Sequence, residues 1–146
     1  MNKSRILEMV KDRLMEKIRK FENLIDSTRA SNNDTKSSMG DKYETGREML
    51  QQEINNLQRQ LNETLSQQAS LQKITGEPCQ KVQTGALVQT DKGLFYIAVS
   101  TGDLILDNLK IIAISPESPL AKSMDALGEG QSFSLNNISQ TITKIW

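Results

Sequence analysis

Three carboxylates in one polar segment are the side chains whose types and spacing best suit chemistry. Asp34, Asp41 and Glu44 fall within residues 31–48, a stretch punctuated by Gly and Ser and set between two segments with helical patterning. If those segments fold back on each other, the carboxylates lie at the far end of a helical arm. Such groups either act on a partner into which the arm reaches, or solvate and cap the turn between two helices.

The capping alternative has its own support in the sequence. Ser38 and Asp41 have the spacing of a capping box with Asp in place of Glu, and Asp41 with Glu44 would serve equally at a helix start. Asp34, between an Asn and a Thr, alternatively forms an Asx turn. We therefore expect a capping role for at least one of Asp41 and Glu44, and both alternatives stay open for Asp34.

Two stretches of helical periodicity must position this segment. In the first, Ser4 is the expected N-cap, and apolar residues recur at steps of three and four: Leu7, Val10, Leu14, Ile18, Phe21 and Ile25. In the second, which residues 76–78 end, the stripe is Met49 or Leu50, Ile54, Leu57, Leu61, Leu65 and then Leu71 or Ile74. Narrow stripes with a short connection predict an antiparallel coiled-coil hairpin over residues 1–76, with its tip near 31–40.

The composition changes after Pro78, and residues 80–146 are expected to form a small, β-rich α+β domain. Runs at 86–90 and 94–100 flank a hairpin turn, residues 101–103 turn the chain, and residues 109–115 form a buried strand. Ser118 and Pro119 open a short helix as its N-cap and first residue. Strands at 131–135 and 141–146 complete a set of about five. The aromatic side chains are expected to form the core: Phe95, Tyr96, Phe133 and Trp146.

Composition excludes several kinds of function. Lys and Arg total 18, as do Asp and Glu, so the chain is neutral and poorly suited to bind nucleic acid through phosphates alone. It has no histidine and one cysteine, which excludes a zinc site, a histidine-based catalytic triad and an internal disulfide. No apolar run suits a signal peptide or a membrane span, so we expect a cytoplasmic protein. Cys79 has no histidine or second cysteine to activate it and is expected to be an inert thiol.

Two motifs, taken with this architecture, resemble one family. The first is YETGRE at residues 43–48, at the start of the second helix, with Asp34 upstream. The second is SPLAK at residues 118–122, followed by Gly130 and a strand. A coiled-coil hairpin that carries the first motif, followed by a small domain that carries the second, resembles the Gre-type bacterial transcription elongation factors over nearly the whole chain. The resemblance implies an FKBP-like fold for residues 80–146.

The resemblance also implies a partner and a chemistry. In that family the FKBP-like domain docks at the rim of the secondary channel of bacterial RNA polymerase, and the hairpin extends down the channel to the active site. Acidic tip residues there help to hold Mg²⁺ and a water that cleaves the 3′ end of backtracked RNA, a task that suits carboxylate ligands. By this resemblance Asp34 and Asp41 are tip carboxylates and magnesium ligands, and Glu44 is a substitute.

The same resemblance implies which other residues make contacts. Tyr43, Arg47, Ser118 and Pro119 would contact the polymerase or the RNA, although Tyr43 and Arg47, four residues apart on a helix, alternatively stack on each other. Mg²⁺ would be bound only in the complex. The chain would be a monomer and no enzyme itself, because it stimulates cleavage by the polymerase. An FKBP-like fold does not by itself imply prolyl isomerase activity.

The tip departs from the family pattern, and this departure defines the alternative functions. The residue three places after Asp34 is Ser37, where the family has Glu, and Lys42 replaces the carboxylate before Tyr43. One alternative is therefore a regulator that binds the secondary channel without promoting cleavage. The other is an unrelated coiled-coil adaptor whose hairpin binds a partner helix or self-associates.

Overall fold

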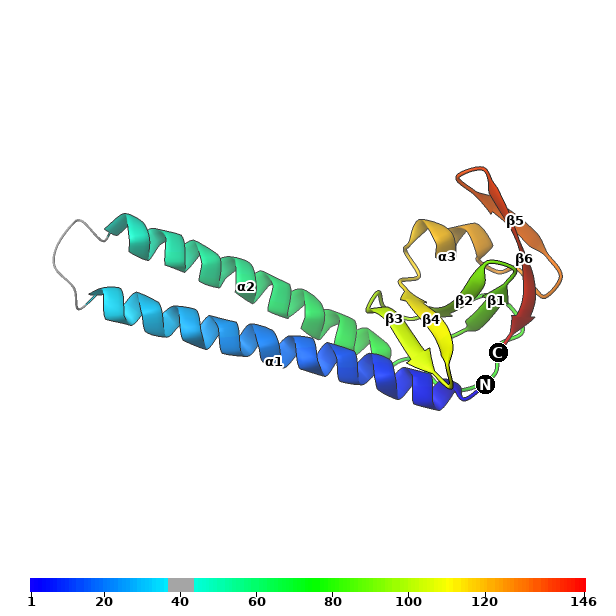
Figure 1. Ribbon diagram of the computed structural model, residues 1–146, viewed down its shortest axis with the longest axis horizontal. Coiled ribbons are helices and arrows are strands. Elements are labelled where there is room, and N and C mark those ends of the chain that lie inside the picture. Colours follow the sequence, from blue (N-terminus) through cyan, green and yellow to red (C-terminus); the bar gives the residue numbers. More distant parts are fainter. Residues whose placement is uncertain (37–43) are drawn as a thin grey trace. The chain divides into compact units, whose positions relative to one another are not determined.

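The computed structural model describes residues 1–36 and 44–146, with side chains described for 1–31 and 46–146. The chain forms two compact units, one of Leu14–Ala69 and one of Met1–Arg13 together with Ser70–Trp146. Helices α1 (Lys3–Lys36) and α2 (Glu44–Leu71), which Figure 1 labels, each contribute residues to both units. The first turns of α1 thus belong, by their contacts, with the sheet that follows much later in the sequence.

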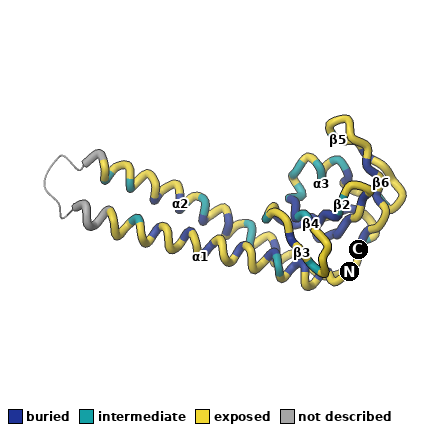
Figure 2. Tube along the Cα trace, viewed as in Figure 1, coloured by how far each residue is buried: buried dark blue, intermediate teal, exposed yellow. Residues whose placement is uncertain are grey.

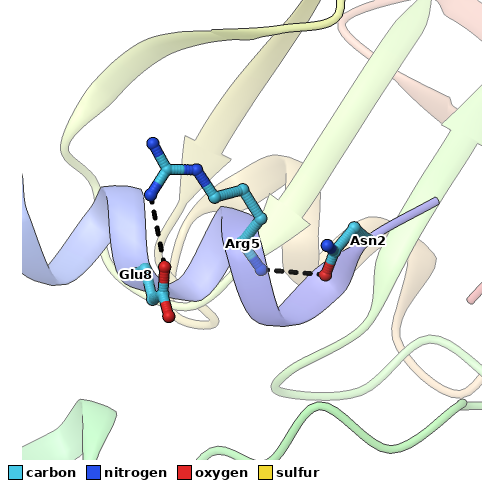
Figure 3. Close-up of polar contacts among 3 residues, drawn as sticks. All are labelled: Asn2, Arg5 and Glu8. Carbon is cyan, nitrogen blue, oxygen red and sulfur yellow. Dashed lines mark hydrogen bonds and ion pairs between the residues drawn. The ribbon is translucent and has the colours of Figure 1, made fainter.

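Asn2, and not Ser4, caps the start of α1. The Asn2 Oδ1 atom accepts a hydrogen bond from the Arg5 backbone N–H at 3.1 Å, as Figure 3 shows. The Arg5 guanidinium in turn pairs with the Glu8 carboxylate at 3.2 Å. The expected capping role of Ser4 is therefore wrong: its Oγ atom lies 2.7 Å from where a side-chain Cβ would stand on Gly76, so it packs against that glycine.

The unit of Leu14–Ala69 is a pair of antiparallel helices held by one apolar seam. Figure 2 shows buried positions recurring along both helices, and six of them form one cluster: Ile18, Phe21, Ile25, Ile54, Leu57 and Leu61. All six were expected in the stripes, and the antiparallel hairpin is confirmed. Beyond Leu61 the seam continues through Thr64, which is 1% exposed, whereas Leu65 is 41% exposed. The expectation that Leu65 lies in the stripe is therefore wrong, and Thr64, three residues after Leu61, takes the buried position.

The C-terminal ends of α1 and α2 both differ from the ends expected from the sequence. Residues 31–36, expected in the turn, are helical. The Thr28 hydroxyl donates to the Leu24 carbonyl at 2.7 Å and the Ser31 hydroxyl to the Ser27 carbonyl at 3.2 Å, so these polar side chains bond within the helix and do not end it. Helix α2 ends at Leu71, not near residue 76.

The early end of α2 follows from packing in the unit to which residues 70–146 belong. Leu71 is fully buried. The Ile74 Cγ2 atom lies 3.2 Å from where a Cβ would stand on Gly85, whose φ is +91°. Ile74 therefore leaves the helical path to pack against a glycine that has no side chain and a left-handed backbone.

A mixed sheet of six strands lies in the described part of the second unit. Its order is β3-β4-β2-β1-β6-β5, with β2 parallel to β4 and the other neighbours antiparallel. The strands are β1 (Leu87–Thr90), β2 (Gly93–Ile97), β3 (Gly102–Leu106), β4 (Leu109–Ile114), β5 (Ser132–Leu135) and β6 (Ile138–Ile145). Together with the helical hairpin this confirms an α+β fold.

Strand β3 is the element that the sequence interpretation missed. Residues 101–103 were expected only as a turn, but Gly102 begins a strand in which Leu104 is fully buried opposite Ile111. The turn lies instead at Asp107 and Asn108, with φ values of +52° and +65°. Two consecutive residues in this left-handed region suit a tight two-residue hairpin, for which Asp and Asn are favoured.

Each face of the sheet is covered. Helix α3 (Pro119–Met124) covers one face, where its Ala121 and Met124 share a core with Val88, Phe95 and Ile97. The other face carries side chains that alternate with these, among them the fully buried Tyr96, Leu104 and Ile111. We infer that the first turns of α1 cover it, because Ile6 and Val10 are fully buried in the same unit.

The expected aromatic core is confirmed for three of its four members. Phe95, Tyr96 and Phe133 are buried, whereas Trp146 is half-buried with the Lys144 ammonium 4.9 Å above its ring. Among the described residues, no helix is long and apolar enough to cross a membrane.

Candidate functional site

The three candidate carboxylates flank or occupy the connection between the two long helices. Asp34 lies in the last turn of α1, two residues before its end, and so has a helical backbone and not that of a turn. Glu44 is the first residue of α2, where the helix dipole favours a carboxylate. Asp41 and Tyr43 lie outside the described residues, as does Ser38 of the possible capping box.

The magnesium site therefore stays a prediction. Its two ligands, Asp34 and Asp41, are separated by residues that the structure does not describe, and the Asp34 side chain is not described either. Elsewhere, in the part of the chain with described side chains, no group of three acidic, His or Cys residues is placed to hold a metal ion. The hairpin connection remains the candidate for metal binding.

Arg47 is half-buried in the first turns of α2. Its expected stacking partner, Tyr43, is outside the described range, so neither stacking nor contact with a partner is decided for this pair.

The turn before α3 holds the second candidate group. The Ser118 Oγ atom accepts a hydrogen bond from the Ala121 N–H at 3.2 Å, and Pro119 is in the first turn, which confirms the expected cap. The Ser115 hydroxyl donates to the Glu117 carboxylate and accepts from the Glu117 N–H at 3.1 Å. This hydroxyl lowers the pKa of the exposed Glu117 carboxyl. The turn is thus held by its own side chains, and contact of Ser118 or Pro119 with a partner stays a prediction.

A cluster around Cys79 was missed by the sequence interpretation. Lys3 is only 5% exposed, and its Nζ atom donates to the carbonyls of Glu77 at 2.6 Å and Trp146 at 3.0 Å. The same ammonium lies 3.6 Å from the Cys79 Sγ atom, to which Gln83 Nε2 also donates at 3.2 Å. One signal was present in the sequence: Lys3 precedes Leu7 and Val10 at the spacing of the apolar stripe, which places it on the buried face of α1.

The Tyr96 hydroxyl is a further unusual group in the same unit. It is fully buried and has no hydrogen-bond partner among the described residues. Burial, with a smaller contribution from the charge of Cys79, raises its pKa to about 12. A buried hydroxyl without a partner costs free energy, roughly 1–3 kcal/mol, so this position is well packed but unfavourable for a polar group.

By these features the chain belongs to the class of α+β proteins in which a long helical hairpin precedes a mixed sheet. No protein-family model matches it, and no curated protein matches its sequence. Among solved structures it is similar to GreA factor homolog 1 (Gfh1) of Thermus thermophilus, with 16% identity and a TM-score of 0.39 over 93% of this chain and 94% of that one.

Two further structures show a similar degree of likeness. A structure of the transcription factor Gfh1 has 13% identity and a TM-score of 0.36, and Gfh1 of Thermus aquaticus has 16% identity and a TM-score of 0.36; each comparison covers 92% of both chains. At TM-scores this low the likeness carries no conclusion, and the fold described above rests on the chain's own elements.

Proposed function

We propose that this chain is a transcription elongation factor that inserts its helical hairpin into the secondary channel of bacterial RNA polymerase in the cytoplasm. The observation that carries the proposal is the hairpin itself, whose connection bears Asp41 and is flanked by Asp34 and Glu44. The resemblance of residues 43–48 and 118–122 to the Gre-type motifs supports the same partner.

The dimensions of the helices suit an inserted arm. Helices α1 and α2 contain 34 and 28 residues, which correspond to about 50 and 42 Å at 1.5 Å per residue. Their pairing depends on a single narrow seam. Most of the remaining described surface is polar and suits an aqueous channel, although Met15, Leu24, Met49 and Leu65 are exposed on it. A helix pair of this kind can carry acidic residues at its end without any further core.

In this proposal the chemistry belongs to the polymerase. Asp34 and Asp41 would help to hold a Mg²⁺ ion in the complex, with Glu44 as a substitute, near the RNA 3′ end. Carboxylate oxygens fit this ion, which keeps several waters and takes one or two protein ligands. The ion would supply activation of water and stabilisation of charge. The chain, as a monomer, would contribute the arm and its carboxylates, and the turn at Ser118 and Pro119 would contact the polymerase.

One sequence observation favours a second candidate, a channel-binding regulator that does not promote cleavage. Ser37 and Lys42 stand where the Gre-type pattern has carboxylates. A lysine beside the acidic residues would weaken their hold on a cation by repulsion. The two candidates share the docking and differ only in the chemistry at the tip.

A backtracked-complex assay tests both candidates. Purified bacterial RNA polymerase is stalled in a backtracked complex, and 3′ RNA cleavage is followed with the wild-type chain, Asp34→Asn and Asp41→Asn. Asp26→Asn is the matched control, because Asp26 is an exposed acid on α1 outside the candidate site. Cleavage that is lost in Asp34→Asn or Asp41→Asn but kept in Asp26→Asn supports the first candidate.

The other results are equally decisive. Polymerase binding without stimulated cleavage supports the regulator, and the absence of polymerase binding refutes both candidates and leaves the coiled-coil adaptor.

A further inference from the structure

One stretch of the sheet unit, residues 130–143, contains no charged side chain, whereas 25% of the residues in the whole chain are charged. The stretch comprises β5, the turn that follows it and most of β6. Figure 1 shows this hairpin at one border of the sheet, where β5 is the outermost strand. Natural sheets keep an exposed border from pairing with other strands by placing charges on it, lysine above all. The border at β5 lacks that protection.

The backbone of β5 has hydrogen-bonding groups that β6 does not use. A two-residue turn at 136–137, with φ values of +53° and +65°, follows Leu135, so Leu135 forms a hydrogen-bonded pair with β6. Such pairs alternate along an antiparallel ladder, and the next one is at Phe133. The N–H and C=O groups of Ser132 and Ser134 therefore point away from β6, and they bond to no other element in the described part of the chain.

The side chains of the same two residues form an exposed face with β6. The Ser132 Oγ atom lies 2.9 Å from the Thr141 Oγ1 atom, and the Ser134 Oγ atom lies 3.1 Å from the Ser139 Oγ atom. All four residues are exposed, whereas Phe133 points to the opposite face and is buried in the core. The outer edge of the sheet thus carries small, neutral hydroxyl groups that neither repel nor crowd a second strand.

We propose that β5 pairs antiparallel with β5 of a second copy of this chain, across a twofold axis at Phe133. In this register Ser132 of each copy lies opposite Ser134 of the other. The outward groups of the two strands then form four main-chain hydrogen bonds, two for each pair of opposed serines. The strand is self-complementary, as a closed twofold interface requires. No charge on this border selects a partner of another kind, so a second copy is the occupant that the edge itself specifies.

The pairing is weak and depends on concentration. Strand β5 is four residues long, and two strands of this length bury much less than the roughly 1,200 Å² of a small, stable interface. The dimer therefore forms at high protein concentration, whereas the chain stays a monomer at the lower concentrations of a cleavage assay. The pairing is independent of the function proposed above.

Sedimentation equilibrium of the full chain tests the proposal. The weight-average mass should rise from 16.4 kDa toward twice that value between about 10 µM and about 1 mM protein. Ser132→Lys with Ser134→Lys places like charges opposite each other and should raise the dissociation constant about tenfold. Ser139→Lys with Thr141→Lys is the matched control, because it removes the same two hydroxyl pairs and adds the same charge on the inner strand.

A mixture of two variants provides an independent measurement. Ser132→Glu with Ser134→Glu should associate as poorly as the corresponding lysine variant. An equimolar mixture of the two should form a heterodimer at least as tight as the wild-type dimer, because opposite charges then face each other across the paired strands.

Three results would overturn the proposal: a mass that stays at the monomer value up to about 1 mM, equal losses of association in the lysine variants of β5 and β6, or a mixture that does not associate. Circular dichroism establishes that each variant is folded. If a variant does not fold, amide hydrogen exchange of the wild-type chain decides alone. The amides of Ser132 and Ser134 should become protected as concentration rises, while that of Phe133, bonded to β6, should not change. Exchange at Ser132 and Ser134 that is independent of concentration refutes the pairing.

Discussion

The seam of the helix pair predicts how strongly one leucine should stabilise the arm. Leu57 is 8% exposed and belongs to the six-residue cluster between α1 and α2. Truncation of a buried leucine to alanine costs about 2–5 kcal/mol, which includes the cavity that is left. A seam between two helices is open at its sides and can collapse onto the gap, so we expect the lower end for Leu57→Ala, about 2–3 kcal/mol.

Leu65 provides a matched control on the same helix. It is the same residue type eight positions further along α2, but it is 41% exposed because Thr64 takes the seam position. Leu65→Ala should therefore cost less than about 1 kcal/mol, since much of its surface is already in water and alanine favours helix.

Urea unfolding followed by two signals measures the difference. Far-ultraviolet circular dichroism reports mainly on the helices, and the fluorescence of Trp146, the single tryptophan, reports on the sheet unit. Leu57→Ala should shift the dichroism transition more than the fluorescence transition. Equal losses from Leu57→Ala and Leu65→Ala would refute the assignment of Leu57 and Thr64 to the seam.

Three further predictions concern the sheet unit. Ser118→Ala should destabilise it by about 1 kcal/mol through loss of the α3 cap, and Ser118→Asp should retain the stability, both measured by tryptophan fluorescence in urea. Asn137, with a φ of +65°, should tolerate glycine but lose up to about 1–2 kcal/mol on change to alanine, which thermal unfolding would reveal. Because the pKa of Tyr96 is raised to about 12 in the fold, stability should be intact below pH 10 and fall between pH 10 and 12. Tyr96→Phe should lose that part of the pH dependence in urea titrations, and an unchanged alkaline decline would contradict a buried phenol at this position.

The helical seam could be predicted from sequence because it depends on spacing alone. Residues at steps of three and four share one face of a helix whatever their tertiary partners, so all six members of the cluster were found. The ends of the helices could not be predicted in this way. They depend on hydroxyl groups that bond within α1 and on Ile74 packing against Gly85, and neither is a periodic signal.

Strand β3 and the Cys79 cluster were both missed by the sequence interpretation, for two different reasons. The signal for β3 was present, since Asp107 and Asn108 form a two-residue turn between apolar runs, but the glycine at position 102 favoured a turn there. For Cys79 the sequence offers little, because Lys3 is 76 residues away and only the fold brings them together. The candidate magnesium ligands Asp34 and Asp41 stay predictions from sequence.

The position of Arg13 has a consequence for association between copies of the chain. Its guanidinium donates to the Asp103 carbonyl of β3 at 3.0 Å and to the carbonyl of Thr101, the residue just before β3, at 3.5 Å. Strand β3 ends the sheet. The carbonyls of residues two positions apart in a strand point to the same side, here away from β4. Without Arg13 they could accept hydrogen bonds from a strand of another molecule. A residue of the first helix therefore occupies two acceptors at the border of the sheet that an added strand would need, and at the opposite border strand β5 is only four residues long.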